Sequence, residues 1–183
     1  MKKLLLCSLA LMMVLGLTAC GQEETVEPEI SETTETETTE TETEGETEDV
    51  ATVFTLDGSE LAETMKPAIE KAYANVSAGE IVIGEIIPEN FLGYTFVPFQ
   101  EGIKAVSADP MIGSISHSVV LIEAEEGVDL EAMAEEILTN ADTRKWICVE
   151  AEKADVAVKG NQLLFVMSDE VTVDTMIANF IAE

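Results

Sequence analysis

The Thr/Glu-rich segment at 21–49 limits where this chain can fold more than any other feature. It repeats Thr and Glu from 36 to 44 and has almost no apolar residue. Such a segment cannot bury a core, and its like charges repel one another and extend it. The folded part must therefore come from 50–183, which is 183 − 49 = 134 residues, enough for one domain. We predict a disordered linker over 20–49 and a single domain over 50–183.

The first twenty residues have the three parts of an export signal. Lys2 and Lys3 precede an apolar run at 4–15, and small residues follow at 16–20. The apolar run is shorter than the roughly 20 residues that a bilayer core requires, which argues against an uncleaved transmembrane helix. We therefore expect a cleaved signal peptide at 1–19. Plain secretion, with Cys20 incidental, is the other alternative.

The segment Leu17-Thr18-Ala19-Cys20-Gly21 resembles the lipobox of bacterial lipoproteins. This resemblance implies that the Cys20 thiol carries a diacylglyceryl group and that cleavage falls just before it. Two acyl chains anchor stably, because each buried methylene contributes about 0.8 kcal/mol. The expected location is the outer face of the bacterial cell membrane, and the expected partners are that membrane, through the lipid, and an unidentified protein or small ligand.

The charge of the expected mature chain is strongly negative. Without Lys2 and Lys3 the count is 7 − 37 = −30. A field of this sign repels polyanions, so nucleic acid is excluded as a partner. Anionic lipid headgroups are repelled as well. The charge therefore favours a domain held off the membrane surface, a cationic partner, or solubility alone.

The first half of the domain is predicted from local patterns. Strand character at 53–56 precedes a helix capped by Ser59, with Pro67 inside it. The apolar run at 81–87 fits either a strand or a short buried helix. The aromatic-rich stretch 88–99 is expected to be irregular, with rings that close one side of the core.

The second half gives a clearer alternation. Strands at 103–107 and 114–123 flank a turn at 109–113, and a helix capped by Asp129 follows. A strand at 146–151, a hairpin over 156–168 and a helix from Thr172 complete the chain. This order predicts an α+β fold, with a mostly antiparallel sheet, about three helices packed on one face, and no parallel βαβ unit.

His117 and Cys148 are the candidates for chemistry. His117 shares a strand face with apolar residues, which favours a buried, hydrogen-bonded histidine, and Cys148 lies in an apolar run that predicts a buried, inert thiol. The alternative is an enzyme in which His117 acts as a base beside Ser116, Ser118 or Cys148, although no nucleophile-elbow motif accompanies it. One His and one free Cys cannot complete a zinc shell, and the calcium-loop pattern is absent. We therefore predict no catalytic, cofactor-binding or metal-binding residue.

Arg144 and Lys145 form the densest positive spot in this acidic chain, and Trp146 follows them. Cation and aromatic together favour recognition, so His117, Arg144, Lys145 and Trp146 are the predicted partner or ligand contacts. The alternative is a helix C-terminus neutralised by basic residues.

The chain resembles small uncharacterised lipoproteins of Gram-positive bacteria in three segments. They are the run at 140–149, the Gly160-Asn161 hairpin and the run Leu163-Leu164-Phe165-Val166-Met167-Ser168. The resemblance covers about 56–183. It implies a lipoprotein with an α+β domain and supplies no site residue. The expected function is a non-enzymatic binding or interaction module. The alternatives are an accessory subunit of a transport or envelope complex, and an enzyme using His117 or Cys148.

Overall fold

The computed structural model describes residues 51–183. The predicted signal peptide, the lipobox with Cys20 and the linker at 20–49 lie outside the described residues. Within 51–183, no helix has the length and apolar character needed to span a membrane.

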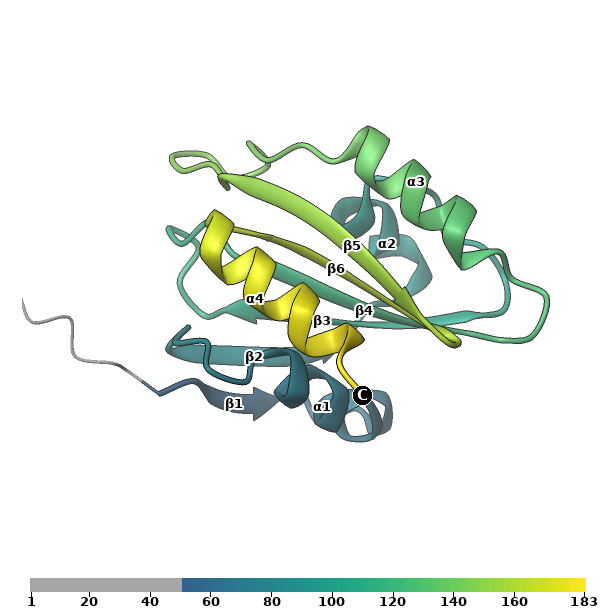
Figure 1. The fold of residues 1–183 in the computed structure, drawn as a ribbon, viewed down its shortest axis with the longest axis horizontal. Helices are drawn as coiled ribbons and strands as arrows, with labels where there is room; N and C mark the ends of the chain where they lie inside the picture. The colour runs from purple at the N-terminus through teal and green to yellow at the C-terminus, as the bar shows by residue number, and fades with distance from the viewer. Residues whose placement is uncertain (1–50) are drawn as a thin grey trace, which may run out of the picture. The chain divides into compact units, whose positions relative to one another are not determined.

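The domain is built on one six-stranded sheet in the order β1-β2-β3-β4-β6-β5 (Figure 1). Its strands are β1 (Val53–Leu56), β2 (Glu80–Glu85), β3 (Ile103–Pro110), β4 (Ser118–Ala124), β5 (Lys153–Lys159) and β6 (Gln162–Ser168). All neighbours pair antiparallel except β1 and β2, which are parallel and are joined through a helix. This β1-α1-β2 unit contradicts the prediction that no parallel βαβ unit is present.

Four helices accompany the sheet: α1 (Glu60–Ala72), α2 (Pro88–Thr95), α3 (Leu130–Asn140) and α4 (Glu170–Ile181). The side chains of Ser59, Asp129 and Asp169 accept hydrogen bonds from the first-turn amides of α1, α3 and α4. These bonds satisfy amides that have no partner within the helix, which explains where the three helices begin. The predicted Ser59 and Asp129 caps are confirmed.

The helices cover both faces of the sheet because both faces of its central strands are apolar. Val119, Leu121 and Leu164 pack with α1 and α4, whereas Val120 and Phe165 pack with α2 and α3. In Figure 1, α4 lies in front of the strands and α2 behind them. The α+β fold with its mostly antiparallel sheet is confirmed. The prediction of about three helices on one face is wrong, since a sheet apolar on both faces requires cover on both.

Three segments differ from their predictions. β3 extends through Pro110, into the turn expected at 109–113, and β4 starts at Ser118, four residues after the start expected for that strand. The strand expected at 146–151 is absent; residues 141–152 form an irregular connection, and β5 starts only at Lys153. Ile147 is fully exposed, and Cys148 is exposed as well, so the thiol is not the buried group that was expected. The stretch expected to be irregular contains α2, although its rings do close the core, with Phe91 buried against Phe99.

Candidate functional site

The four predicted contact residues lie at one end of the sheet, where β4 and β5 begin and β3 and β6 end. We call this the loop end. It comprises the β3–β4 connection (111–117), the α3–β5 connection (141–152) and the first turn of α4, and it lies on the left of Figure 1. His117 lies in the first connection, and Arg144, Lys145 and Trp146 lie in the second.

His117 is buried, at 4% exposure, on the face of the sheet covered by α1 and α4. The Tyr73 hydroxyl lies 2.5 Å from its Nε2, and the Ser168 hydroxyl lies 3.0 Å from its Nδ1. Ser168 Oγ donates in turn to Asp169 Oδ2 at 3.2 Å. A hydroxyl that gives its proton to Asp169 is free to accept from Nδ1–H, which leaves Nε2 to accept from Tyr73. The prediction of a buried, hydrogen-bonded histidine is confirmed.

Burial lowers the pKa of His117 to about 4, with a smaller contribution in the same direction from the Lys145 charge and an opposing one from Asp169. The imidazole is therefore neutral near pH 7. A general base works best with a pKa near the operating pH and with a ring nitrogen directed at the substrate. Both ring nitrogens of His117 are occupied by hydroxyls of the protein, so the arrangement is that of a structural bridge.

Lys145 lies on the opposite face of the sheet. Its Nζ donates to Ser118 Oγ at 2.9 Å and lies 5.0 Å from the ring centroid of Trp146 and 5.7 Å from that of Tyr94. Burial lowers the pKa of Lys145, and the Asp109 charge opposes this effect. Desolvation also raises the pKa of Asp109, against hydrogen bonds from Ser118 and Ser107 and the charge of Lys145. Lys145 therefore ties the α3–β5 connection to the start of β4.

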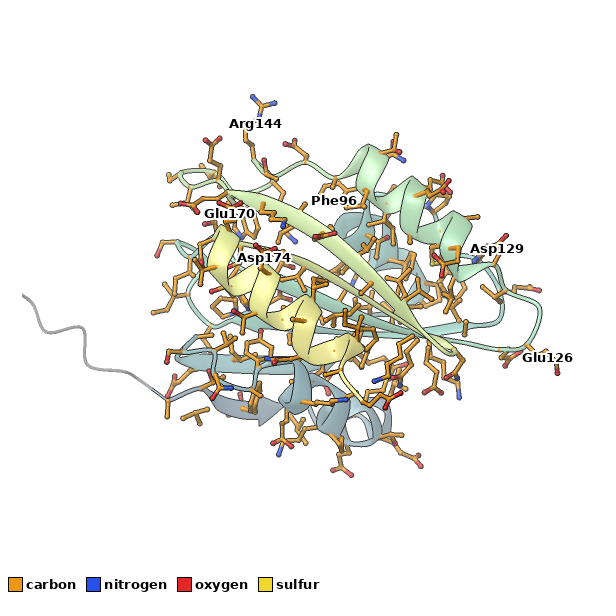
Figure 2. All side chains as sticks on the ribbon, viewed as in Figure 1. Phe96, Glu126, Asp129, Arg144, Glu170 and Asp174 are labelled. Carbon is orange, nitrogen blue, oxygen red and sulfur yellow. The ribbon has the colours of Figure 1, made fainter. Side chains whose placement is uncertain are left out.

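Arg144 and Trp146 differ from Lys145 in their exposure. Arg144 projects away from the ribbon in Figure 2, and its nearest ionic partner is Asp142, with Nε 3.6 Å from Oδ1. Trp146 is half-buried against the core side of the connection. Of the predicted positive spot, only Arg144 presents its charge directly to solvent.

The alternative nucleophiles are placed unfavourably for catalysis. Ser118 Oγ is within the distance range of a nucleophile–base pair with Lys145, but Ser118 is 2% exposed. Cys148 is exposed on the α3–β5 connection, whereas His117 is enclosed in the core. The structure therefore does not join His117 and Cys148 into one accessible centre.

Three residues that interact with His117 or Lys145 were not predicted from the sequence: Tyr73, Asp109 and Ser168. Tyr73 follows the apolar spacing of α1 and carries no mark of its polar role. Asp109 was interpreted as a turn former because Pro110 follows, yet β3 continues through both residues and pairs with β2. The available signal for Asp109 was its position as the one charged residue between Lys104 and Glu123.

A hollow of about 740 Å³ lies at the opposite end of the domain, along 124–131 and the turn between β5 and β6. Glu126 and Asp129 on its rim lie at the far side of the domain from Arg144 and Glu170 in Figure 2. None of the four predicted contact residues lines it. Across 51–183, no three His, Cys, Asp or Glu side chains are grouped so that they could hold a metal ion.

Comparison of the chain with protein-family models, with curated proteins and with solved structures finds no significant match.

Proposed function

We propose that this chain is a lipoprotein anchored through Cys20 to the outer face of a bacterial membrane, and that its α+β domain is a non-enzymatic interaction module. The structure of the loop end supports the proposal of an interaction module. There, a buried polar cluster holds two connections in place, and the connections present apolar side chains to solvent, with Ile147 fully exposed. Large exposed apolar side chains that gather at one place are typical of binding surfaces.

The polar cluster supports a structural role for its residues. His117 uses both ring nitrogens inside the protein, and Lys145 is bound to Ser118. Buried polar groups with all partners satisfied make a core rigid and specific. Within 51–183, no buried side-chain nitrogen or oxygen lacks a hydrogen-bond partner. The cluster therefore supports rigid presentation of the surface and offers no unpaired group for catalysis.

The anchor is tested by metabolic labelling of cells with an alkyne fatty acid, followed by mass spectrometry of the full chain. We expect label on the wild-type protein and on Cys148→Ala, and none on Cys20→Ala. The lipid-free Cys20→Ala protein should be recovered away from the membrane fraction. Cys148→Ala is the matched control, since it removes an exposed thiol from the folded domain. Label that persists in Cys20→Ala, or a retained leader, would disprove the anchor.

A further inference from the structure

The loop end carries a group of exposed large apolar side chains. Met111 is 63% exposed, Ile112 61%, Ile115 44%, Ile147 101% and Val171 76%. We call these five residues the loop-end patch. The connection 111–117 contains no charged residue, and neither does the run 146–149, in a chain of which 25% is charged. Solubility alone does not account for an uncharged connection and an uncharged apolar run at the same end of the domain.

Hydrogen bonds tie together the three segments that carry the patch. Lys145, next to Trp146 and Ile147, donates to Ser118, where β4 leaves the 111–117 connection. His117 at the end of that connection binds Ser168, which precedes α4. The amide of Glu170 donates to the Glu152 carboxylate at 3.1 Å, which joins the start of α4 to the 141–152 connection. The segments that carry the patch are therefore held together at one end of the domain.

The 141–152 connection is fixed from within as well. The Ala151 amide donates to Thr143 O at 2.8 Å, and the Lys145 amide donates to Asp142 O at 3.1 Å. Ala151 is itself buried. A surface that is already ordered loses little conformational entropy on binding, which favours association.

Carboxylates are frequent in the segments that carry Ile147 and Val171. They are Asp142, Glu150, Glu152, Asp169, Glu170 and Asp174, and Figure 2 shows Glu170 and Asp174 on α4 beside this end. Lys153, the nearest basic residue on β5, is already paired with Asp155 and Asp174. We call these carboxylates the acidic border, and Arg144 is the exposed cation of the same segments.

The acidic border distinguishes between the possible binding partners of the loop-end patch. An anionic lipid surface is repelled, and a second copy of the chain would bring two acidic borders together, which costs several kcal/mol for like charges in an interface. A protein surface with an apolar centre and a basic rim complements both parts of the loop end. Interfaces of this type have an apolar core surrounded by polar contacts.

We propose that the loop-end patch docks a partner protein whose contact surface has an apolar centre rimmed by Lys and Arg. The proposal rests on the proposed function of the domain as an interaction module and names its contact surface and the chemistry of its partner. The apolar side chains supply affinity, and the carboxylates steer the basic rim into register.

The test places a photo-crosslinking amino acid in the full-length chain in intact cells, at position 112, 147 or 171. The control positions are 87 and 181, because Ile87 and Ile181 are also exposed apolar residues but lie at the opposite end of the domain, after β2 and at the end of α4. We expect the three patch positions to crosslink to the same protein, through peptides that contain Lys or Arg. The control positions should not crosslink to it.

Two variants then test the chemistry, with the crosslinker kept at position 112. Ile147→Asp should lower the yield at least about tenfold, the effect expected for an apolar anchor near the centre of an interface. The double variant Glu150→Lys with Glu170→Lys should also lower the yield, and added salt should reproduce that loss in the wild-type chain. Ile181→Asp is the matched control and should leave the yield unchanged.

The outcomes separate this proposal from the one on which it rests. Crosslinks to a protein from positions 87 or 181 alone would leave an interaction module in place and overturn the loop-end patch. Crosslinks from the patch to lipid or to another copy of the chain, or to a protein with no dependence on Glu150 and Glu170, would overturn the partner's chemistry. No protein crosslink from any position would overturn both proposals.

Discussion

His117 is held between two hydroxyl groups on the α1/α4 face of the sheet. Tyr73 reaches Nε2 from the end of α1, and Ser168 reaches Nδ1 from the end of β6, so one imidazole links three elements that are far apart in the sequence. The Tyr73 and His117 rings also pack edge to face, with their centroids 5.6 Å apart. Removing the ring would leave a cavity and two buried hydroxyls without that partner. Each of these defects lowers the free energy of unfolding.

We therefore expect His117→Ala to lower the free energy of unfolding by about 3 kcal/mol, the sum of a cavity and a lost buried hydrogen bond. Urea denaturation followed by circular dichroism measures this change. Ser114→Ala, at an exposed position of the same connection, should stay within about 0.5 kcal/mol of wild type. Equal stability of the two variants would show that the histidine bridge contributes nothing.

The same residue predicts how stability depends on pH. The pKa of His117 falls from 6.5 to about 4 on folding. Between these values the unfolded chain binds a proton and the folded chain does not, so the free energy of unfolding decreases as the pH falls through this window. The full loss is on the order of 3 kcal/mol, and stability is independent of this group above about pH 6.5. Urea titrations at several pH values measure the slope.

His117→Asn isolates this effect, because other groups titrate nearby. The raised pKa of Asp109 acts in the opposite sense as the pH falls, and the lowered pKa of Asp169 matters below 3.8. The difference in unfolding free energy between wild type and His117→Asn should shrink as the pH falls from about 6.5 to about 4. A constant difference would contradict the buried neutral imidazole.

At the scale of elements, the α3–β5 connection is held by side-chain contacts although it has no regular structure. Lys145 crosses from it to Ser118 at the start of β4, beside the rings of Trp146 and Tyr94. Arg144 is the neighbouring cation, but it lies in solvent with Asp142. Two adjacent basic residues thus have different roles, which provides a matched pair for an experiment.

Lys145→Met should lower the free energy of unfolding by about 2 kcal/mol, because it leaves Ser118 and Asp109 buried without their cation. Hydrogen exchange at the Ala151 amide, which closes the connection through Thr143, should become faster than in wild type. Arg144→Met should change stability by less than about 0.5 kcal/mol, as for other exposed ion pairs. Similar effects of the two substitutions would show that Lys145 does not hold the α3–β5 connection to β4.

The sequence predicts elements well where a cap and a sustained apolar spacing agree. Ser59 and Asp129 marked the starts of α1 and α3, and the Gly160-Asn161 turn marked the β5–β6 hairpin. Helix α2 was missed because it has eight residues, contains Gly93, and ends at Phe96 with a φ of 64° in place of a terminal glycine. The packing of Phe96 against Phe165 stabilises this unusual ending, and such a contact is not visible locally.

Sequence patterns singled out residues that the structure places at one end of the sheet, but not the contacts that these residues make. The rarity of positive charge in the sequence led to Arg144 and Lys145, and the single histidine led to His117. The run Trp146-Ile147-Cys148-Val149 has the composition of a buried strand, and this misplaced the thiol. A short apolar run does not show whether it faces the core or solvent; the tertiary contacts of Lys145 and Ala151 place this run on the surface.

The charge of the whole domain acts over longer distances than any of these contacts. Residues 51–183 contain 24 acidic and seven basic residues, and four ion pairs are formed among the described side chains. Most carboxylates of these residues therefore lie outside the four ion pairs, and their like charges repel one another. This self-repulsion destabilises the compact state, while the doubly covered sheet holds the fold together.

Raising the salt concentration should therefore stabilise the domain. From about 10 mM to about 1 M NaCl the Debye length falls from about 30 Å to about 3 Å, which removes most of the repulsion between exposed carboxylates. The few exposed ion pairs that are also screened contribute little. We expect the free energy of unfolding to rise by about 1 kcal/mol or more, measured by urea denaturation at each salt concentration. KCl should act in the same way, because screening depends on ionic strength. A free energy that is flat or falls with salt would contradict the repulsion, and an effect of Na⁺ alone would indicate a bound cation.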